Sequence, residues 1–310
     1  MNIIIHGSLA FDRIMNFPGK FKENILPNKI HNLNVSFNIH QMEEMRGGTG
    51  GNIVYTLALL GEHPVLVSCI GKDGSPYIEF LRNHGVNTEH ITTVENEVTA
   101  VCNIITDTDN NQITAFFVGA AAQPSKCDFS QWQPEETLVV FAPANNKTDS
   151  MHYIADCQRL GLRYIFDPGQ TTYDYNGKEL KEIIGGAWML AVNDYELEVV
   201  LKKTGLSEQN LLERTEVLLV TLGKKGSVMK TRDGKIFDIP AFVQDKLVDP
   251  TGAGDAYRAG LIKGLALGKS LEECGKMGAC AASYAIEKVG TQQHTFTLAE
   301  FDARYKAFFA

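Results

Sequence analysis

The sequence lacks the features that mark several large classes of protein. It has no cluster of lysine and arginine, and its formal net charge is −8. Because nucleic acids and anionic membranes attract clustered basic residues, neither is an expected partner. No apolar run reaches the roughly 18 residues that cross a bilayer. The N-terminal "MNIIIHGSLAFD" predicts a β-strand rather than a signal peptide, so we expect a cytoplasmic protein.

Several site motifs are also missing. No Cys-x-x-Cys pair and no His-Glu-x-x-His occurs, so neither a redox dithiol nor a catalytic zinc site is expected. The six scattered cysteines lie mostly in apolar segments, which favours buried, reduced thiols. No Gly-x-x-x-x-Gly-Lys-Ser/Thr occurs, and no Gly-x-Gly-x-x-Gly follows the first strand. A P-loop and a Rossmann dinucleotide site are therefore not supported.

What the sequence does contain is an alternation of short apolar runs and amphipathic helical patterns. The apolar runs predict strands at 2–10, 65–71, 137–142, 164–169, 188–192 and 217–223. Strands that are apolar almost throughout are typical of a parallel sheet covered by helices on both faces. The pattern therefore predicts an open α/β fold, in which ligands bind beyond the carboxyl ends of the strands.

Two segments interrupt this alternation. Residues 12–45 show no clear amphipathic helix but include the strand-like run "IHNLNVSFNI" (30–39). Residues 97–119 give two strand patterns joined by "DTDNN", which is a hairpin signal. Together the segments predict a small β lid. An antiparallel edge of the main sheet agrees equally well with the pattern.

The most informative motif is "DPTGAGDAYRAG", residues 249–260. Its small residues can present backbone N–H groups to an anion, at the start of a helix whose dipole adds positive potential. Such a loop would stabilise the charge on a transferred phosphoryl group. Asp255 beside it would accept the proton of an attacking hydroxyl. A helix cap next to a glycine turn explains the same residues, and both interpretations stand at this point.

Further polar groups follow other predicted strands. "VTLGKKGS" (220–227) has a loop pattern suited to nucleotide phosphates, and "NDYE" (193–196) places an amide and a carboxylate on one helix face, as a magnesium site could use. "GGTGGN" (47–52) could hold a polar substrate through Asn52, and "GSLAFD" (7–12) could bind two vicinal hydroxyls through Asp12. Each of these motifs also fits a turn or a capped helix.

Taken together, "GGTGGN", "NDYE" and "DPTGAGDAYRAG" resemble the signatures of the PfkB (ribokinase-like) carbohydrate kinase family, over nearly the whole chain. "GSLAFDRIMNFPGKF", "LNVSFNI", "FVGAA" and "VTLGKKG" are most similar to bacterial adenosine kinases of this type. The resemblance implies one domain, 1–310: a three-layer α/β/α sandwich with a mainly parallel central sheet and a small β-sheet lid from about 12–45 and 97–119. It implies ATP-dependent phosphorylation of the adenosine 5′-hydroxyl in purine salvage, with Mg²⁺ and K⁺.

The resemblance also implies roles for individual residues. Asp255 is the general base, and the anion hole comprises Gly252, Ala253 and Gly254. The ATP and magnesium residues are Asn193, Thr221, Gly223, Gly226, Gly252, Gly254 and, through water, Glu196. The nucleoside residues are Ser8, Asp12, Ser36, Gly48, Asn52, Phe116, Gln170 and Asp255. The monovalent-cation residues are Asp249 and Thr251, with "EKVGTQQH" near Gly290.

Some alternatives stay open. A sugar kinase, a kinase of another nucleoside and a nucleoside-binding protein without catalysis all agree with the motifs. The aromatic Phe37 and Phe116 favour a substrate that carries a base. Cys102 stands where a second stacking aromatic can occur in the family, and only Gln170 is evident for base contacts after "DPG". Strand-like lid edges favour a homodimer.

Overall fold

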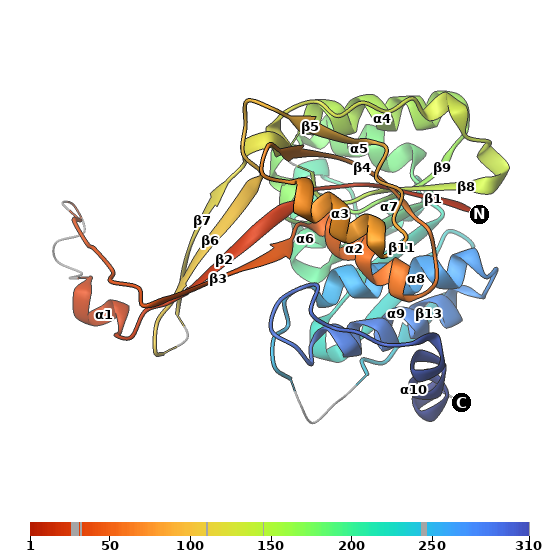
Figure 1. Cartoon of the computed structure of the whole chain (residues 1–310). Helices are drawn as coiled ribbons and strands as arrows, with labels where there is room; N and C mark the ends of the chain where they lie inside the picture. Colours follow the sequence, from red (N-terminus) through yellow and green to blue (C-terminus); the bar gives the residue numbers. More distant parts are fainter. Residues whose placement is uncertain (26–30, 32, 110, 145, 243–246, 310) are drawn as a thin grey trace.

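The main sheet of the computed structural model has nine strands within the part of the chain that the structure describes, which omits residues 26–30, 32, 110, 145, 243–246 and 310. Their order is β13-β12-β11-β10-β9-β8-β1-β4-β5 (Figure 1). All neighbours from β11 to β5 are parallel, whereas β12 and β13 are antiparallel. The strands are β1 (Asn2–His6), β4 (Val65–Gly71), β5 (Ile91–Val94), β8 (Thr137–Phe141), β9 (Arg163–Phe166), β10 (Met189–Asn193), β11 (Val217–Thr221), β12 (Ser227–Thr231) and β13 (Ile236–Ile239).

Helices cover both faces of this sheet, as the apolar strands predict. Ile3 and Ile5 of β1 point into one hydrophobic core, and Ile4 between them points into the other. The first core is closed by α2 (Thr49–Leu59), α3 (Ser75–Asn83), α8 (Ala253–Ala266), α9 (Leu271–Ala285) and α10 (Leu298–Phe309). The second is closed by α4 (Lys147–Leu160), α5 (Gly177–Gly186), α6 (Asp194–Thr204) and α7 (Glu208–Leu212). None of the described helices is both long and apolar enough for a membrane crossing.

The predicted three-layer α/β/α architecture is therefore confirmed, with differences at its edges. Each of the six predicted main-sheet strands is present, but the first ends at His6 rather than at residue 10. The chain turns there and begins a strand of another sheet at Ala10. The edge strands β5 and β13, and β12 next to β13, were not predicted, because intermediate or exposed positions break up the apolar run in each.

A second, four-stranded sheet extends away from the body of the molecule (Figure 1). Its order is β3 (Gln41–Gly47), β2 (Ala10–Asn16), β6 (Ala100–Thr106) and β7 (Gln112–Phe117). Parallel pairing of β2 with β6 joins the two sequence segments that interrupt the alternation. The small sheet is separate from the main one, so the alternative of an antiparallel edge is wrong. Whether it acts as a lid is a question of function.

One strand expectation in this region is wrong. The described part of the run 30–39, which is 31 and 33–39, forms no strand, and β3 begins only at Gln41. Instead Phe37 packs edge-on against Phe17 and Phe21, with ring centroids 4.9 and 5.1 Å apart. The apolar alternation thus supplies a small aromatic cluster next to α1 (Phe21–Asn24), at the far end of the small sheet. Ile30, Asn32 and Asn110 of "DTDNN" lie outside the described residues.

A buried ion pair fixes α8 to the main sheet. Arg258 of α8 and Asp167, which follows β9, are only 7% and 2% exposed. The guanidinium binds both carboxylate oxygens, Nε to Oδ2 and Nη2 to Oδ1 at 3.1 Å. Its Nη1 also donates to the Gly254 carbonyl at 3.2 Å. This two-pronged geometry holds the first turn of α8 at the carboxyl edge of the sheet.

Replacing Arg258 by methionine leaves a buried carboxylate without its partner. Loss of one member of such a pair costs about 3–5 kcal/mol of unfolding free energy. We expect that loss in urea denaturation of Arg258→Met, and recovery of much of it in Arg258→Met/Asp167→Leu, where both charges are gone. Lys235→Met breaks an exposed pair with Asp233 and serves as the control, with no resolvable change. Equal effects of Arg258→Met and Lys235→Met would contradict the role given to the buried pair.

Candidate active site

The side chain of Asp255 lies where two distant parts of the sequence meet. It stands in the first turn of α8, after Gly252, which caps the helix in the left-handed region at φ 78°. The buried Asn52 of α2 donates from Nδ2 to Asp255 Oδ2 at 2.7 Å. The motifs at 47–52 and 249–260 therefore form one site. Neither motif by itself predicts this arrangement.

The surroundings of Asp255 suit a base that works near neutral pH. Burial raises its pKa to about 6, against the opposing effects of the Asn52 hydrogen bond and the Arg258 charge. The carboxylates of Asp167 and Asp12 add to the rise. Burial likewise raises the pKa of Asp12 to about 6, with a further contribution from Asp249. Above about pH 6 both side chains are ionised, and Asp255 is poised to take a proton.

The glycine loop before α8 presents fewer free amides than the motif suggests. The N–H of Ala253 donates to the Pro250 carbonyl at 3.2 Å. The amides of Gly252 and Gly254 have no acceptor among the described residues. A side chain at Gly252 would also bring its Cβ to 3.1 Å from Thr291, in a backbone conformation that L-residues disfavour. The anion-hole assignment thus stays a prediction, best supported for Gly252 and Gly254.

The segment "NDYE" forms a capping box. Asn193 Oδ1 accepts the Glu196 N–H, and Glu196 Oε2 accepts the Asn193 N–H, both at 2.8 Å. Burial raises the pKa of Glu196, and the box leaves its Oε1 unused. Within the described residues no three His, Cys, Asp or Glu side chains converge as a metal site. One free carboxylate oxygen suits a magnesium ion that keeps most of its waters and binds phosphates.

The predicted ATP loop lies next to this box. Thr221 ends β11 and is the register partner of Asn193 at the end of β10. The tight turn that follows has Gly223 at φ 56° and Gly226 at φ 91°. A Cβ at Gly226 would also meet the Ile239 carbonyl at 2.0 Å, so this glycine is required by the fold itself.

On the nucleoside side, the small sheet places four side chains in one cross-strand row. Met45, Asp12, Cys102 and Phe116 are direct register partners on β3, β2, β6 and β7. Paired residues share a sheet face, so Asp12, Cys102 and Phe116 face the same side. Phe116 is 46% exposed. The row thus carries a carboxylate on β2, next to Met45, and an open aromatic ring at its β7 end.

The start of α2 is held against the turn after β1. The Ser8 hydroxyl accepts the Thr49 N–H at 3.1 Å and so caps the helix. Gly48 has φ 86°, and a Cβ there would lie 2.6 Å from the Ser8 carbonyl. Ser8 and Gly48 therefore have a structural task, which positions Asn52 one turn further along.

Two predicted nucleoside residues are not brought to the site. Ser36 is exposed beside Phe37, at the far end of the small sheet from Asp12. Gln170 is exposed in the turn after β9, without a contact to the other predicted residues that the structure describes. A ligand role for either residue stays a prediction.

The predicted cation residues do come together. Asp249 accepts the Thr251 N–H at Oδ1 (2.9 Å) and the Gly290 N–H at Oδ2 (3.0 Å). Burial acts to raise the pKa of Asp249, but these hydrogen bonds outweigh it and the pKa is lowered. The carboxylate is thus ionised beside the loop, and potassium binding stays a prediction.

The sequence reasoning missed residues that organise the site. Arg258 interacts with Asp167, Asp255 and Glu196, and so connects the candidate base with the candidate magnesium residue. Its position three residues after Asp255, on the same helix face, was the available signal. Gln292 and Tyr77 also contact the site network, and their sequence context gave no signal.

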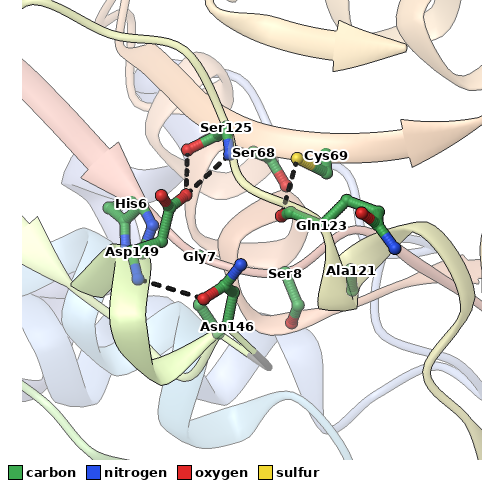
Figure 2. A pocket seen from close by; sticks show the side chains of 11 residues that line it. His6, Gly7, Ser8, Ser68, Cys69, Ala121, Gln123, Ser125, Asn146 and Asp149 are labelled. Atoms are coloured by element: carbon green, nitrogen blue, oxygen red, sulfur yellow. Dashed lines mark hydrogen bonds between the residues drawn. The ribbon is translucent and has the colours of Figure 1, made fainter. Parts of the chain in front are cut away.

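A small polar cavity lies beside Ser8, at the carboxyl ends of β1, β4 and β8 (Figure 2). Its volume of about 20 Å³ corresponds to one water molecule rather than to a base or a sugar. Buried His6 at its wall has its pKa lowered to about 4 by burial, against the effect of Asp149, so the ring is neutral. The cavity therefore does not compete with the Asp255 region as the substrate site.

Comparison with known proteins bears on the family of this chain. The model of the pfkB family of carbohydrate kinases matches residues 8–297. The nucleoside kinase of Methanocaldococcus jannaschii is 35% identical over 84% of this chain and 85% of that protein. The nucleoside kinase of Methanothermobacter thermautotrophicus is 31% identical over 88% and 89%. The structure of Burkholderia thailandensis nucleoside kinase in complex with inosine has a TM-score of 0.88 and 34% identity, covering 99% of this chain and 98% of that one. The chain belongs to the pfkB family of carbohydrate kinases.

Proposed function

We propose that the protein is an ATP-dependent nucleoside kinase that phosphorylates the 5′-hydroxyl of a purine nucleoside, with adenosine as the expected acceptor. The observation that carries the proposal is the row Asp12–Cys102–Phe116 next to Asp255. Strands lie about 4.8 Å apart, so Asp12 and Phe116 are separated by about 10 Å. That span suits a ribose joined to a flat base, whereas a bare sugar would leave Phe116 without a partner.

The proposed reaction follows from the position of Asp255. Its Oδ2 accepts the Asn52 amide, which leaves Oδ1 to take the proton of the acceptor hydroxyl. The hydroxyl oxygen bonds to the γ-phosphorus of ATP as the bond to the bridging oxygen breaks, and ADP leaves. The amides of Gly252 and Gly254, with the α8 dipole, stabilise the charge on the transferred group. Mg²⁺ would neutralise phosphate charge, with Glu196 and Asn193 as the residues that hold it.

Inosine is a second candidate acceptor, because a relative of 34% identity has been solved with it. The name nucleoside kinase on the archaeal relatives does not separate the two purines. We also propose K⁺ at Asp249, Thr251 and Gly290, and closure of the small sheet over the substrate to exclude water. A homodimer through the small sheet is supported by its other face, where Met15, Met42, Ile105 and Ile113 form an apolar row.

A substrate panel tests the proposal directly. ADP release is measured with adenosine, inosine, other nucleosides, ribose and fructose, in Mg²⁺ and K⁺. We expect a purine nucleoside to exceed ribose in kcat/KM by roughly tenfold to a hundredfold, the contribution of base stacking. Preference for ribose or fructose would identify a sugar kinase. Tight adenosine binding without ATP turnover would identify a binding protein.

Changing Asp255 to asparagine tests the base. We expect kcat to fall by roughly 10²- to 10⁴-fold, while nucleoside affinity in equilibrium titration stays near that of the wild type. The wild-type kcat/KM should decline below about pH 6, as Asp255 and Asp12 become protonated. Near-normal kcat in Asp255→Asn would show that another group accepts the proton.

The same variant has a built-in folding control. The pKa of Asp255 is about 6 in the folded protein against an ordinary value of 3.8, so its ionisation weakens the fold as pH rises through about 6. The amide has no charge to bury. Asp255→Asn should therefore be at least as resistant to urea as the wild type at pH 8, and lost turnover cannot be ascribed to unfolding.

Phe116 and Phe117 form a matched pair for testing base stacking. The two rings are similarly exposed, at 46% and 50%, but lie on opposite faces of β7. We expect Phe116→Ala to raise KM for the nucleoside roughly tenfold or more and to leave KM for ribose unchanged. Phe117→Ala should change neither value. The same rise in both variants would argue for a general effect on the small sheet.

A further inference from the structure

The segment Gly290–His294 touches each part of the proposed site, although none of the proposed steps uses its side chains. Its backbone binds Asp249 at Gly290, and Thr291 Oγ1 donates to the Arg46 carbonyl of β3 at 3.0 Å. The same Thr291 packs against Gly252 at the start of α8. The next residue, Gln292, is 3% exposed and points at the nucleoside helix α2. This segment therefore lies between the cation residues, the small sheet and the anion loop.

Gln292 begins a chain of hydrogen bonds that ends on the proposed base. Its Nε2 donates to Asn52 Oδ1 at 2.9 Å, and Asn52 Nδ2 donates to Asp255 Oδ2 at 2.7 Å. The second hydrogen of Nε2 goes to the hydroxyl oxygen of buried Tyr77. Tyr77 in turn donates to the Gly47 carbonyl at 2.8 Å. Each of these four hydrogen bonds thereby pairs one donor with one acceptor.

The charge of Asp255 sets the direction of this chain. An ionised carboxylate only accepts, so Asn52 must turn its amide nitrogen toward Asp255 and its oxygen toward Gln292. Gln292 must then present its own nitrogen to Asn52. The reversed amide would set two oxygens against each other at one of these contacts. The amide orientations of Asn52 and Gln292 thus follow from the charge of Asp255. The shape of an amide group would not decide between its two orientations.

The observed orientation of the Gln292 amide has an energetic cost, which packing by itself does not explain. Gln292 Oε1 is buried and has no hydrogen-bond partner among the described residues. A buried acceptor without a donor typically costs about 1–3 kcal/mol and calls for an explanation. Here the amide keeps both donors on Asn52 and Tyr77 at the expense of its oxygen. In this orientation Gln292 holds Asn52 so that the Asn52 amide nitrogen can donate to Asp255.

We propose that Gln292 is a positioning residue for Asp255. It fixes the Asn52 side chain so that Asn52 holds Oδ2 of Asp255, while Oδ1 of Asp255 stays free for the acceptor hydroxyl. Through Tyr77, Gln292 also connects this arrangement to the small sheet. The inference rests on the proposed kinase function. Gly47 is the last residue of β3, and a Cβ there would lie 2.3 Å from Asp12 Oδ2. Movement of the small sheet at Gly47 would therefore reach both the ribose carboxylate and, through Tyr77 and Gln292, the base.

The test compares Gln292→Met, which keeps the volume and removes both donors, with Gln209→Ala. Gln209 is an exposed glutamine of α7 that takes no part in these hydrogen bonds or in any proposed site. We expect Gln292→Met to lower kcat roughly ten- to a hundredfold, the usual cost of a misplaced catalytic group, with a smaller change in nucleoside KM. Gln209→Ala should match the wild type. Tyr77→Phe keeps the Gln292–Asn52 bond and should lose less kcat than Gln292→Met. Should Gln292→Met fail to fold, Gln292→Ala and Tyr77→Phe carry the comparison.

Two further readouts separate positioning from a merely structural role. The Asn52 hydrogen bond lowers the pKa of Asp255, so its loss should move the acid side of the pH–kcat/KM profile to higher pH. The other charges facing Asp255, on Arg258, Asp167 and Asp12, are untouched by the change. In an Asp255→Asn background, Gln292→Met should lower the residual turnover no further, because residues that act as a unit are not additive. Two results would overturn the proposal. One is an unchanged acid side of the pH–kcat/KM profile in Gln292→Met, and the other is a full additional loss of turnover when Gln292→Met is added to Asp255→Asn.

A titration without turnover keeps the inference distinct from the proposed function. The carboxyl signal of Asp255 is followed by ¹³C NMR against pH in the wild type and Gln292→Met, without nucleoside or ATP. A higher pKa in Gln292→Met supports the positioning contact even if no nucleoside is phosphorylated, in which case only the proposed function fails. An equal pKa in both proteins, with normal nucleoside turnover, defeats the positioning role alone.

Discussion

The buried pair between Arg258 and Asp167 is the constraint on which the site depends. It clamps the first turn of α8 to the carboxyl end of β9, so the glycine loop and Asp255 cannot drift from the edge of the sheet. The single positive charge of Arg258 also faces Asp255 and Glu196. Without it the buried carboxylate of Asp167 and the partly buried ones of Asp255 and Glu196 would repel one another, since burial raises the free energy of each ionised form.

The balance around Asp255 is between burial and compensation. Burial raises the pKa of the carboxyl and so favours its protonated form, which cannot act as a base. The Arg258 charge and the Asn52 amide oppose this effect and leave a pKa of about 6. The proposed base is thus mostly ionised at neutral pH, yet remains basic enough to accept a proton. This intermediate value is what a general base near its working pH requires.

The structure also shows that structural and functional interpretations of a motif need not compete. "NDYE" is a capping box, and it still leaves one Glu196 oxygen free. Gly226 and Gly48 are needed because backbone atoms approach too closely for any side chain. Such residues shape the loops, and the ligand role of these loops stays a proposal. A motif search alone cannot separate these tasks, because both select the same residue types.

Local pattern determined much of this protein. The apolar runs defined six strands of the main sheet, and the glycine loop marked the start of α8. The interrupted segments indicated further β-structure, but the pattern agreed equally with a small lid sheet and with an edge of the main sheet. Local pattern failed where a segment's structure depends on its neighbours in space. Residues 33–39 alternate like a strand but pair with no strand that the structure describes, and Phe37 among them packs in an aromatic cluster instead. The contacts of Asn52 with Asp255 and with Gln292, and of Arg258 with Asp167, were set only by the tertiary structure. They join residues up to 240 positions apart, and no local spacing encodes such a distance.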